Sequence, residues 1–160
     1  MAARDVEPIL MPSVLDRLID PDSGVAGRNT AHAADRIVNA VRRDLEDLLN
    51  THQSQSDLPA EYVELTNSVY TYGLPDPPML TEVALERSQE VGRILEGLIR
   101  RFESRLQDVR VSLLDPGEVR HGRMRFHIEA RMNLEPSPEI GFETVVELST
   151  GHASVKSSGA

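Results

Sequence analysis

The 160-residue chain has no cysteine and no tryptophan, and few of the other aromatic residues. Without cysteine it can form neither a disulfide nor a thiolate metal site, and it has no thiol nucleophile. No stretch approaches the roughly 20 apolar residues that span a bilayer, and residues 1–8 contain no apolar run typical of a signal peptide. We therefore expect a soluble cytoplasmic protein that does not insert into a membrane.

Positive charge is also scarce. The 26 acidic residues outnumber the 17 basic ones, which gives a net charge of −9. Nucleic-acid binding depends on basic surfaces that neutralise phosphates, and anionic membranes attract the same residues. The charge balance therefore argues against both as partners, but it is compatible with a protein partner.

Apolar residues recur at helical spacing in two segments, which predicts helices over residues 32–49 and 81–102. A weaker pattern predicts a short helix over residues 13–19, where Ser13 and Asp16 approximate a capping box. Gly92 and Gly97 fall inside the longest helix and can mark close helix packing. The proline-rich residues 73–78 predict an extended connection before that helix. The apolar stripes of the two long helices are Ile37, Val38, Val41, Leu45, Leu48 and Leu49, and Val91, Ile94, Leu95, Leu98, Ile99 and Phe102.

The period changes to two after residue 108. Alternating apolar and polar residues predict strands over residues 109–114, 123–134 and 140–148, with a short segment at 153–156. A loop centred on Ser137 would place Met132 opposite Phe142, Arg131 opposite Glu143, and His127 opposite Glu147. The predicted fold is α+β, in which N-terminal helices cover one face of a three- or four-stranded antiparallel meander.

We expect one domain over residues 12–156, a flexible leader at 1–11 and a flexible tail at 157–160. This division follows the periodic segments, because residues outside them carry no pattern that predicts a packed element.

No group of residues predicts an active site. A glycosidase needs two carboxyl groups about 5–10 Å apart in a cleft, and one of them needs an apolar pocket. Glu129, Glu143 and Glu147 instead lie on the predicted wet face of the sheet, among arginines. No two histidines have metal-ligand spacing, and no glycine-rich phosphate loop follows a strand. The sequence therefore predicts no catalytic, cofactor-binding or metal-binding residue, no cofactor and no small-molecule substrate.

Five segments, in order, carry a resemblance to a known family. They are PSVLDRL at 12–18, VRRDLEDLLNT at 41–51, SVYTYGLPD at 68–76, FESRL at 102–106 and VRV at 109–111. Together they resemble the TssE family of type VI secretion baseplate proteins, which is related to the "lysozyme-like" phage baseplate-wedge proteins. The resemblance covers about residues 12–150. It implies a structural, non-enzymatic subunit that joins wedge partners to the first ring of the contractile sheath. The baseplate of such a machine assembles at the inner face of the cytoplasmic membrane.

Two positions depart from the family pattern. His52 stands where the family usually has arginine, and Glu103-Ser104-Arg105 replaces the family's Glu-Pro-Arg. In relatives this corner contacts the helical core bundle of the wedge. The resemblance therefore implies that Glu103, Ser104 and Arg105 form a protein interface, although serine lacks the fixed φ of proline. A simpler interpretation is that Arg105 complements the dipole at the end of a helix.

The resemblance also implies strand pairing with the sheath, which needs an exposed sheet edge. The candidate edges are residues 109–114 and 153–156, and the sequence does not choose between them. Two alternatives remain open at this stage. One is a peptidoglycan-cleaving enzyme, and the other is a cytoplasmic adaptor outside any injection machine.

Overall fold

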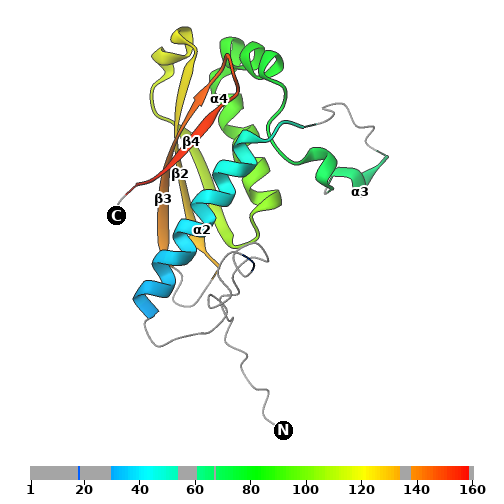
Figure 1. Ribbon diagram of the computed structural model, residues 1–160. Helices are drawn as coiled ribbons and strands as arrows, with labels where there is room; N and C mark the ends of the chain where they lie inside the picture. The colour runs from blue at the N-terminus through cyan, green and yellow to red at the C-terminus, as the bar shows by residue number, and fades with distance from the viewer. Residues whose placement is uncertain (1–17, 19–29, 54–60, 67, 134–137, 159–160) are drawn as a thin grey trace.

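The computed structural model describes residues 18, 30–53, 61–66, 68–133 and 138–158. Helices come first and strands follow, which confirms the α+β prediction (Figure 1). The predicted helix over residues 13–19 lies outside the described residues, apart from Leu18. The elements are α2 (Thr30–Asn50), α3 (Val63–Thr66), η2 (Val69–Thr71), α4 (Pro77–Phe102), β1 (Leu106–Leu113), η3 (Pro116–His121), β2 (Arg123–Met132), β3 (Glu139–Glu147) and β4 (Ala153–Ser158).

Helix α2 confirms the predicted amphipathic pattern. Val41, Leu45 and Leu49 are fully buried, and Ile37 and Val38 pack against the same core. The helix exceeds its predicted bounds by two residues at the start and one at the end. This is within the usual uncertainty of helix ends, because the last turns lack part of their hydrogen bonds.

Helix α4 begins four residues earlier than the sequence predicted. Pro77 and Pro78 occupy its first turn after the N-cap residue Asp76, so the predicted extended connection was too long. The first N–H groups of a helix have no intrahelical acceptor, and proline therefore loses nothing there. The helix is also kinked at Arg87, whose φ of −146° and ψ of 70° are not helical.

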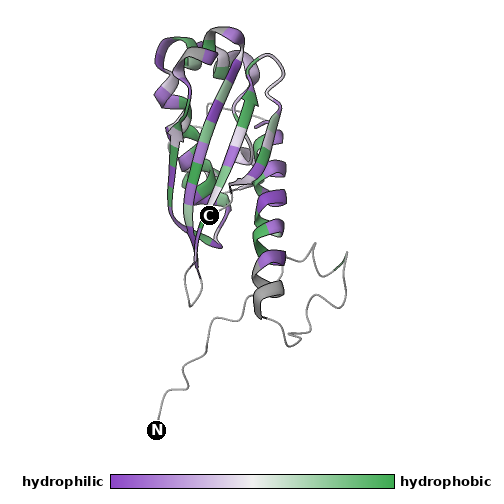
Figure 2. Ribbon diagram, turned by 90° about the vertical axis from the view of Figure 1, so that its left-hand side faces the viewer, coloured by the Kyte–Doolittle hydropathy of each residue, from purple (hydrophilic) through white to green (hydrophobic). Residues whose placement is uncertain are grey.

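The four strands form one antiparallel meander in the order β1-β2-β3-β4. Alternate residues of each strand face the helices, and the hydropathy colours alternate along the strands accordingly (Figure 2). Helices α2 and α4 cover this face, and the opposite face carries the charged residues. The buried residues of the sheet are Leu106, Val109, Met124, Phe126, Ile128, Ala130, Met132, Phe142, Thr144, Val146, Ala153 and Val155.

The predicted register of the β2–β3 hairpin was wrong by four residues. Arg131 pairs with Glu139, His127 with Glu143, and Arg123 with Glu147. The ladder extends further into the loop than expected, because the Pro138 carbonyl accepts a 3.0 Å hydrogen bond from the N–H of Met132. Proline has no backbone N–H to donate to the ladder, but its carbonyl can still accept a hydrogen bond. The error is an even number of residues, so every side chain keeps its predicted face.

Both edge strands are longer than predicted. β1 begins at Leu106 and contains a bulge in which Asp108, with a φ of 54°, and Val109 stand opposite Ala130. β4 continues two residues past Lys156, so that Ser157 pairs with Phe142 and Ser158 with Gly141.

Candidate protein-interface site

The corner between α4 and β1 holds the three residues that the sequence singled out. Glu103 caps the end of α4, where its N–H donates to the Ile99 carbonyl over 2.9 Å. The three side chains differ in exposure, because the chain reverses direction within a few residues. Glu103 is buried, Ser104 is exposed, and Arg105 is partly buried.

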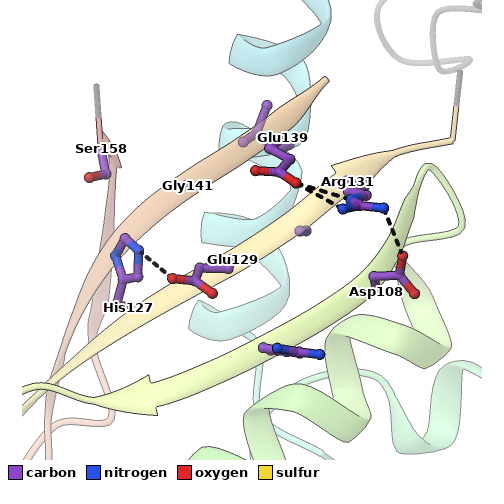
Figure 3. A pocket seen from close by; sticks show the side chains of 10 residues that line it. Asp108, His127, Glu129, Arg131, Glu139, Gly141 and Ser158 are labelled. Carbon is purple, nitrogen blue, oxygen red and sulfur yellow. Dashed lines mark hydrogen bonds and ion pairs between the residues drawn. The ribbon is translucent and has the colours of Figure 1, made fainter. Parts of the chain in front are cut away.

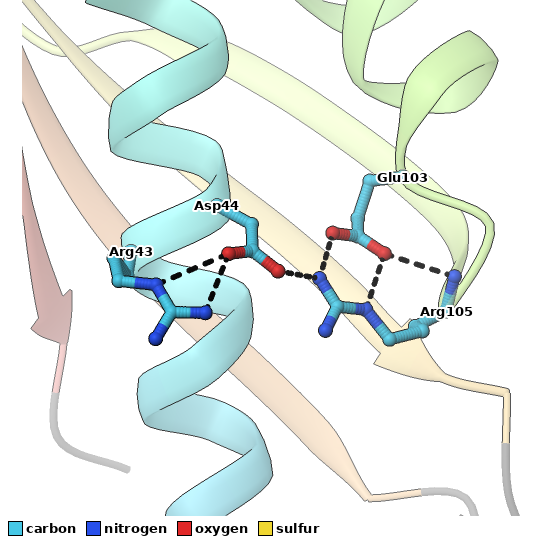
Figure 4. A network of polar contacts seen from close by, with 4 residues as sticks. All are labelled: Arg43, Asp44, Glu103 and Arg105. Carbon is cyan, nitrogen blue, oxygen red and sulfur yellow. Dashed lines mark hydrogen bonds and ion pairs between the residues drawn. The ribbon is translucent and has the colours of Figure 1, made fainter. Parts of the chain in front are cut away.

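Glu103 and Arg105 bind one another within the chain (Figure 4). Arg105 Nε donates to Glu103 Oε1 over 2.7 Å, and Arg105 Nη2 donates to Glu103 Oε2. The backbone N–H of Arg105 also donates to Oε1, over 3.1 Å. The Glu103 carboxylate therefore accepts three hydrogen bonds from one residue, in the two-pronged geometry that makes arginine–carboxylate pairs strong.

Asp44 joins this pair to helix α2. Arg105 Nη2 donates to Asp44 Oδ2 over 2.6 Å, and the Arg43 guanidinium approaches Oδ1 of the same carboxylate to 2.9 Å. We define Arg43, Asp44, Glu103 and Arg105 as the corner network. Asp44 is the member that the sequence analysis missed, although it falls within the segment 41–51. Its signal there is weak, because an acid between arginine and leucine is ordinary on an amphipathic helix.

The corner network stabilises the charged form of the Arg105 guanidinium. The hydrogen bond to Glu103 is the largest cause that raises the pKa of Arg105, and Asp44 adds to it, while burial acts in the opposite direction. The partners of Arg105 are carboxylates within the chain. Interaction with the helix dipole alone therefore does not account for its position.

A pocket of about 420 Å³ opens beside the corner network. Within it, the Tyr72 ring packs edge-on against Phe102 with the ring centroids 5.1 Å apart. The pKa of Tyr72 is raised, first by burial and then by the nearby carboxylates of Asp47, Asp44 and Glu103. The lining residues are Asp44, Leu45, Leu48, Tyr72, Phe102, Glu103, Ser104 and Arg105. Apolar side chains of the lining therefore lie directly beside the charged Arg105 guanidinium.

A second pocket lies on the charged face of the sheet and has a volume of about 560 Å³ (Figure 3). The side chains of its acids Asp108, Glu129 and Glu139 are 71%, 64% and 76% exposed. Arg131 stands between two of them, 3.9 Å from Asp108 and 2.9 Å from Glu139. A carboxyl group acts as a general acid near neutral pH when an apolar pocket encloses it. None of these three acids has such surroundings.

Two further findings concern metals and membranes. Across the part of the chain that the structure describes, no three residues of the types His, Asp or Glu gather as a metal site. In the same residues, no helix combines the length and apolar character needed to cross a bilayer.

These observations define a two-layer α+β domain whose charged side chains form ion pairs on one sheet face and at one corner. A family model described as "Baseplate wedge protein gp25" matches residues 35–137, a range that includes Asp44, Glu103 and Arg105. The chain belongs to this family of baseplate structural proteins, which confirms the resemblance to the phage baseplate-wedge family. No curated protein and no solved structure matches the chain.

Proposed function

We propose that the protein is a non-enzymatic subunit of a type VI secretion baseplate on the cytoplasmic side of the inner membrane. There it links wedge subunits to the first ring of the contractile sheath. The observation that carries the proposal is the family match over residues 35–137. The segments that resemble TssE, at 41–51, 68–76 and 102–106, support the secretion system over a phage tail.

The corner supports wedge binding through Ser104 and Arg105, but not through direct contact with Glu103. Glu103 is only 6% exposed, and Arg105 occupies its carboxylate. Glu103 therefore acts as a positioning residue that holds Arg105, and it does not itself reach a partner. The surface that remains for a wedge subunit consists of exposed Ser104 and the part of Arg105 facing the pocket. The Arg105 side chain is 23% exposed, and only Nε and Nη2 bond within the described chain.

The C-terminal end of β4 supports sheath binding by strand pairing. Helix α2 caps the first part of the β4 edge, because Asn50 bonds both the N–H and the C=O of Ala153, and Arg42 bonds the Val155 carbonyl over 3.2 Å. Residues 153, 155 and 157 share one orientation along the strand, since backbone groups alternate with a period of two. Ser157 comes next, and its outward N–H and C=O meet no partner among the described residues. An added strand can bind there.

Exposed apolar residues also support a protein-contact role. Half of the large exposed apolar side chains of the described residues lie in α3 and η2 or directly before α3. They are Tyr62, Val63, Val69 and Tyr70, which are 53%, 66%, 86% and 48% exposed. Concentrated apolar exposure of this kind typically marks a protein contact.

One experiment tests both contacts with variants that control for each other. In pull-downs, Ser104→Arg places a bulky charge at the mouth of the corner pocket and leaves the corner network intact. We expect it to lose the wedge subunits and to retain the sheath proteins. Ser157→Pro removes one outward N–H and leaves the β3 pairing intact, so we expect the reverse result. Ser157→Ala keeps the N–H and should behave as wild type.

Two results would count against the proposal. Wild-type protein that binds neither set of proteins would favour an adaptor outside any injection machine. Release of soluble fragments from purified peptidoglycan, abolished by a single carboxylate substitution, would favour the peptidoglycan-cleaving alternative.

A further inference from the structure

Two backbone groups on the outer edge of β1 are bound by side chains of helix α4. Residues 110 and 112 pair with β2, so the N–H and C=O groups of Val111 between them face away from it. Arg100 Nη2 donates to the Val109 carbonyl over 2.7 Å. The Val111 N–H donates to Glu96 Oε2 over 3.2 Å. The two side chains thus occupy the donor and acceptor positions that an added strand would use.

The capping residues lie on a single line of α4. Arg100 and Glu96 are one turn apart and form an ion pair of 2.9 Å. One turn earlier, a Cβ on buried Gly92 would stand 3.6 Å from the Val111 carbonyl oxygen. Glycine therefore lets the helix lie close against the edge at that level. Residues 92, 96 and 100 follow the i, i+4 spacing of one helix face.

The chemistry of each cap matches its backbone group. A carboxylate accepts from an N–H and cannot bind a carbonyl, whereas a guanidinium only donates. An unpaired strand edge is a template for another chain, and proteins protect such edges by covering or charging them. Helix α4 covers this part of the edge, and Glu96 and Arg100 supply the negative and the positive charge.

We propose that Glu96 and Arg100 close the β1 edge to strand addition, and that a second copy of this chain pairs there when they are removed. Closure of β1 at Val109 and Val111 favours the β4 end as the edge that takes an added strand. Only this last consequence, when applied to the sheath, rests on the proposed function. The closure itself is a property of the isolated chain and is tested without any partner protein.

The decisive variant exchanges the two side chains, Glu96→Arg with Arg100→Glu. It keeps an ion pair on the helix, but it turns a guanidinium toward the Val111 N–H and a carboxylate toward the Val109 carbonyl. The matched control exchanges Glu90 and Arg93, an exposed pair 3.9 Å apart on the same helix. We expect the first exchange to make the sedimentation-derived mass rise with protein concentration beyond wild type. The control should match wild type.

Hydrogen exchange provides a second measurement on a milder variant, in case the exchanged protein does not fold. Glu96→Ala frees the Val111 N–H, and a lost hydrogen bond to a charged group corresponds to about tenfold or more in opening. We expect the Val111 amide to exchange about tenfold faster, with no change in Glu90→Ala. Unchanged exchange at Val111, or an exchanged variant that sediments as wild type does, would overturn the proposal. Loss of sheath binding in Ser157→Pro bears only on the proposed function.

Discussion

At the scale of single residues, Arg105 is the side chain on which the corner between α4 and β1 depends. It binds the buried carboxylate of Glu103 and the half-buried carboxylate of Asp44. Breaking a buried pair by removing one partner is costly, because the other charge stays behind without compensation.

We therefore expect Arg105→Ala to lower the free energy of unfolding by about 2–3 kcal/mol. This lies below the range of about 3–5 kcal/mol for fully buried pairs, because water screens part of the guanidinium. Urea denaturation measures the change, and Arg93→Ala, in an exposed pair, should stay within about 0.5 kcal/mol of wild type. Adding Glu103→Gln to Arg105→Ala should restore part of the loss. Equal effects of Arg105→Ala and Arg93→Ala would contradict this account.

Tyr72 makes stability depend on alkaline pH. Its pKa in the folded protein is raised above the ordinary value of 10.0 by burial and by neighbouring carboxylates. The folded state thus holds the phenolic proton more tightly than the unfolded state does. This stabilisation is fully present below about pH 10 and is lost as the pH rises above it. We expect Tyr72→Phe to lose less stability than wild type between pH 9 and 11, as measured by thermal unfolding at each pH. Parallel pH profiles would refute the assignment.

At the scale of elements, helix α4 differs from its sequence-based prediction at its prolines and at one of its glycines. The two prolines that suggested an extended connection instead form its first turn. The two glycines inside this helix have different surroundings. Gly92 is buried against Phe126 and the Val111 carbonyl, whereas a Cβ on exposed Gly97 would meet nothing within 4 Å. The prediction of close packing was right for Gly92 and wrong for Gly97. Both glycines lie inside the same helix, and the sequence does not show which of them faces the sheet.

Gly97→Ala should therefore stabilise the protein. Alanine is about 1 kcal/mol more favourable than glycine inside a helix, and nothing obstructs its methyl group. The expected rise in the midpoint of thermal unfolding is about 2–4 °C. Gly92→Leu, in contrast, should lower the midpoint, because its side chain must displace Phe126 or the β1 backbone. A destabilising Gly97→Ala would show that Gly97 has a role that its surroundings do not explain.

At the scale of the whole molecule, the sheet and its helices form one core and leave one sheet face charged. Hydrogen bonds of α2 join distant parts of the chain, such as Asn50 with Ala153 on the β4 edge and Asp44 with Arg105 at the corner. Similar hydrogen bonds occupy part of each sheet edge, because a side chain of α2 binds the β4 backbone and a side chain of α4 binds the β1 backbone. Under the proposed function, the corner and the C-terminal end of β4 are the surfaces that bind the wedge subunits and the sheath.

Periodicity along the sequence determined which residues are helical, which are extended, and which face of each is buried. These properties follow from the geometry of 3.6 and 2 residues per repeat, and they need only neighbours in the chain. The segments that resemble TssE likewise needed only the order of residues. Only the tertiary structure decided the hairpin register, the partner of Arg105 and the state of each edge strand. Each of these depends on residues far apart in the sequence, and one-dimensional spacing does not specify which of many charged side chains will meet.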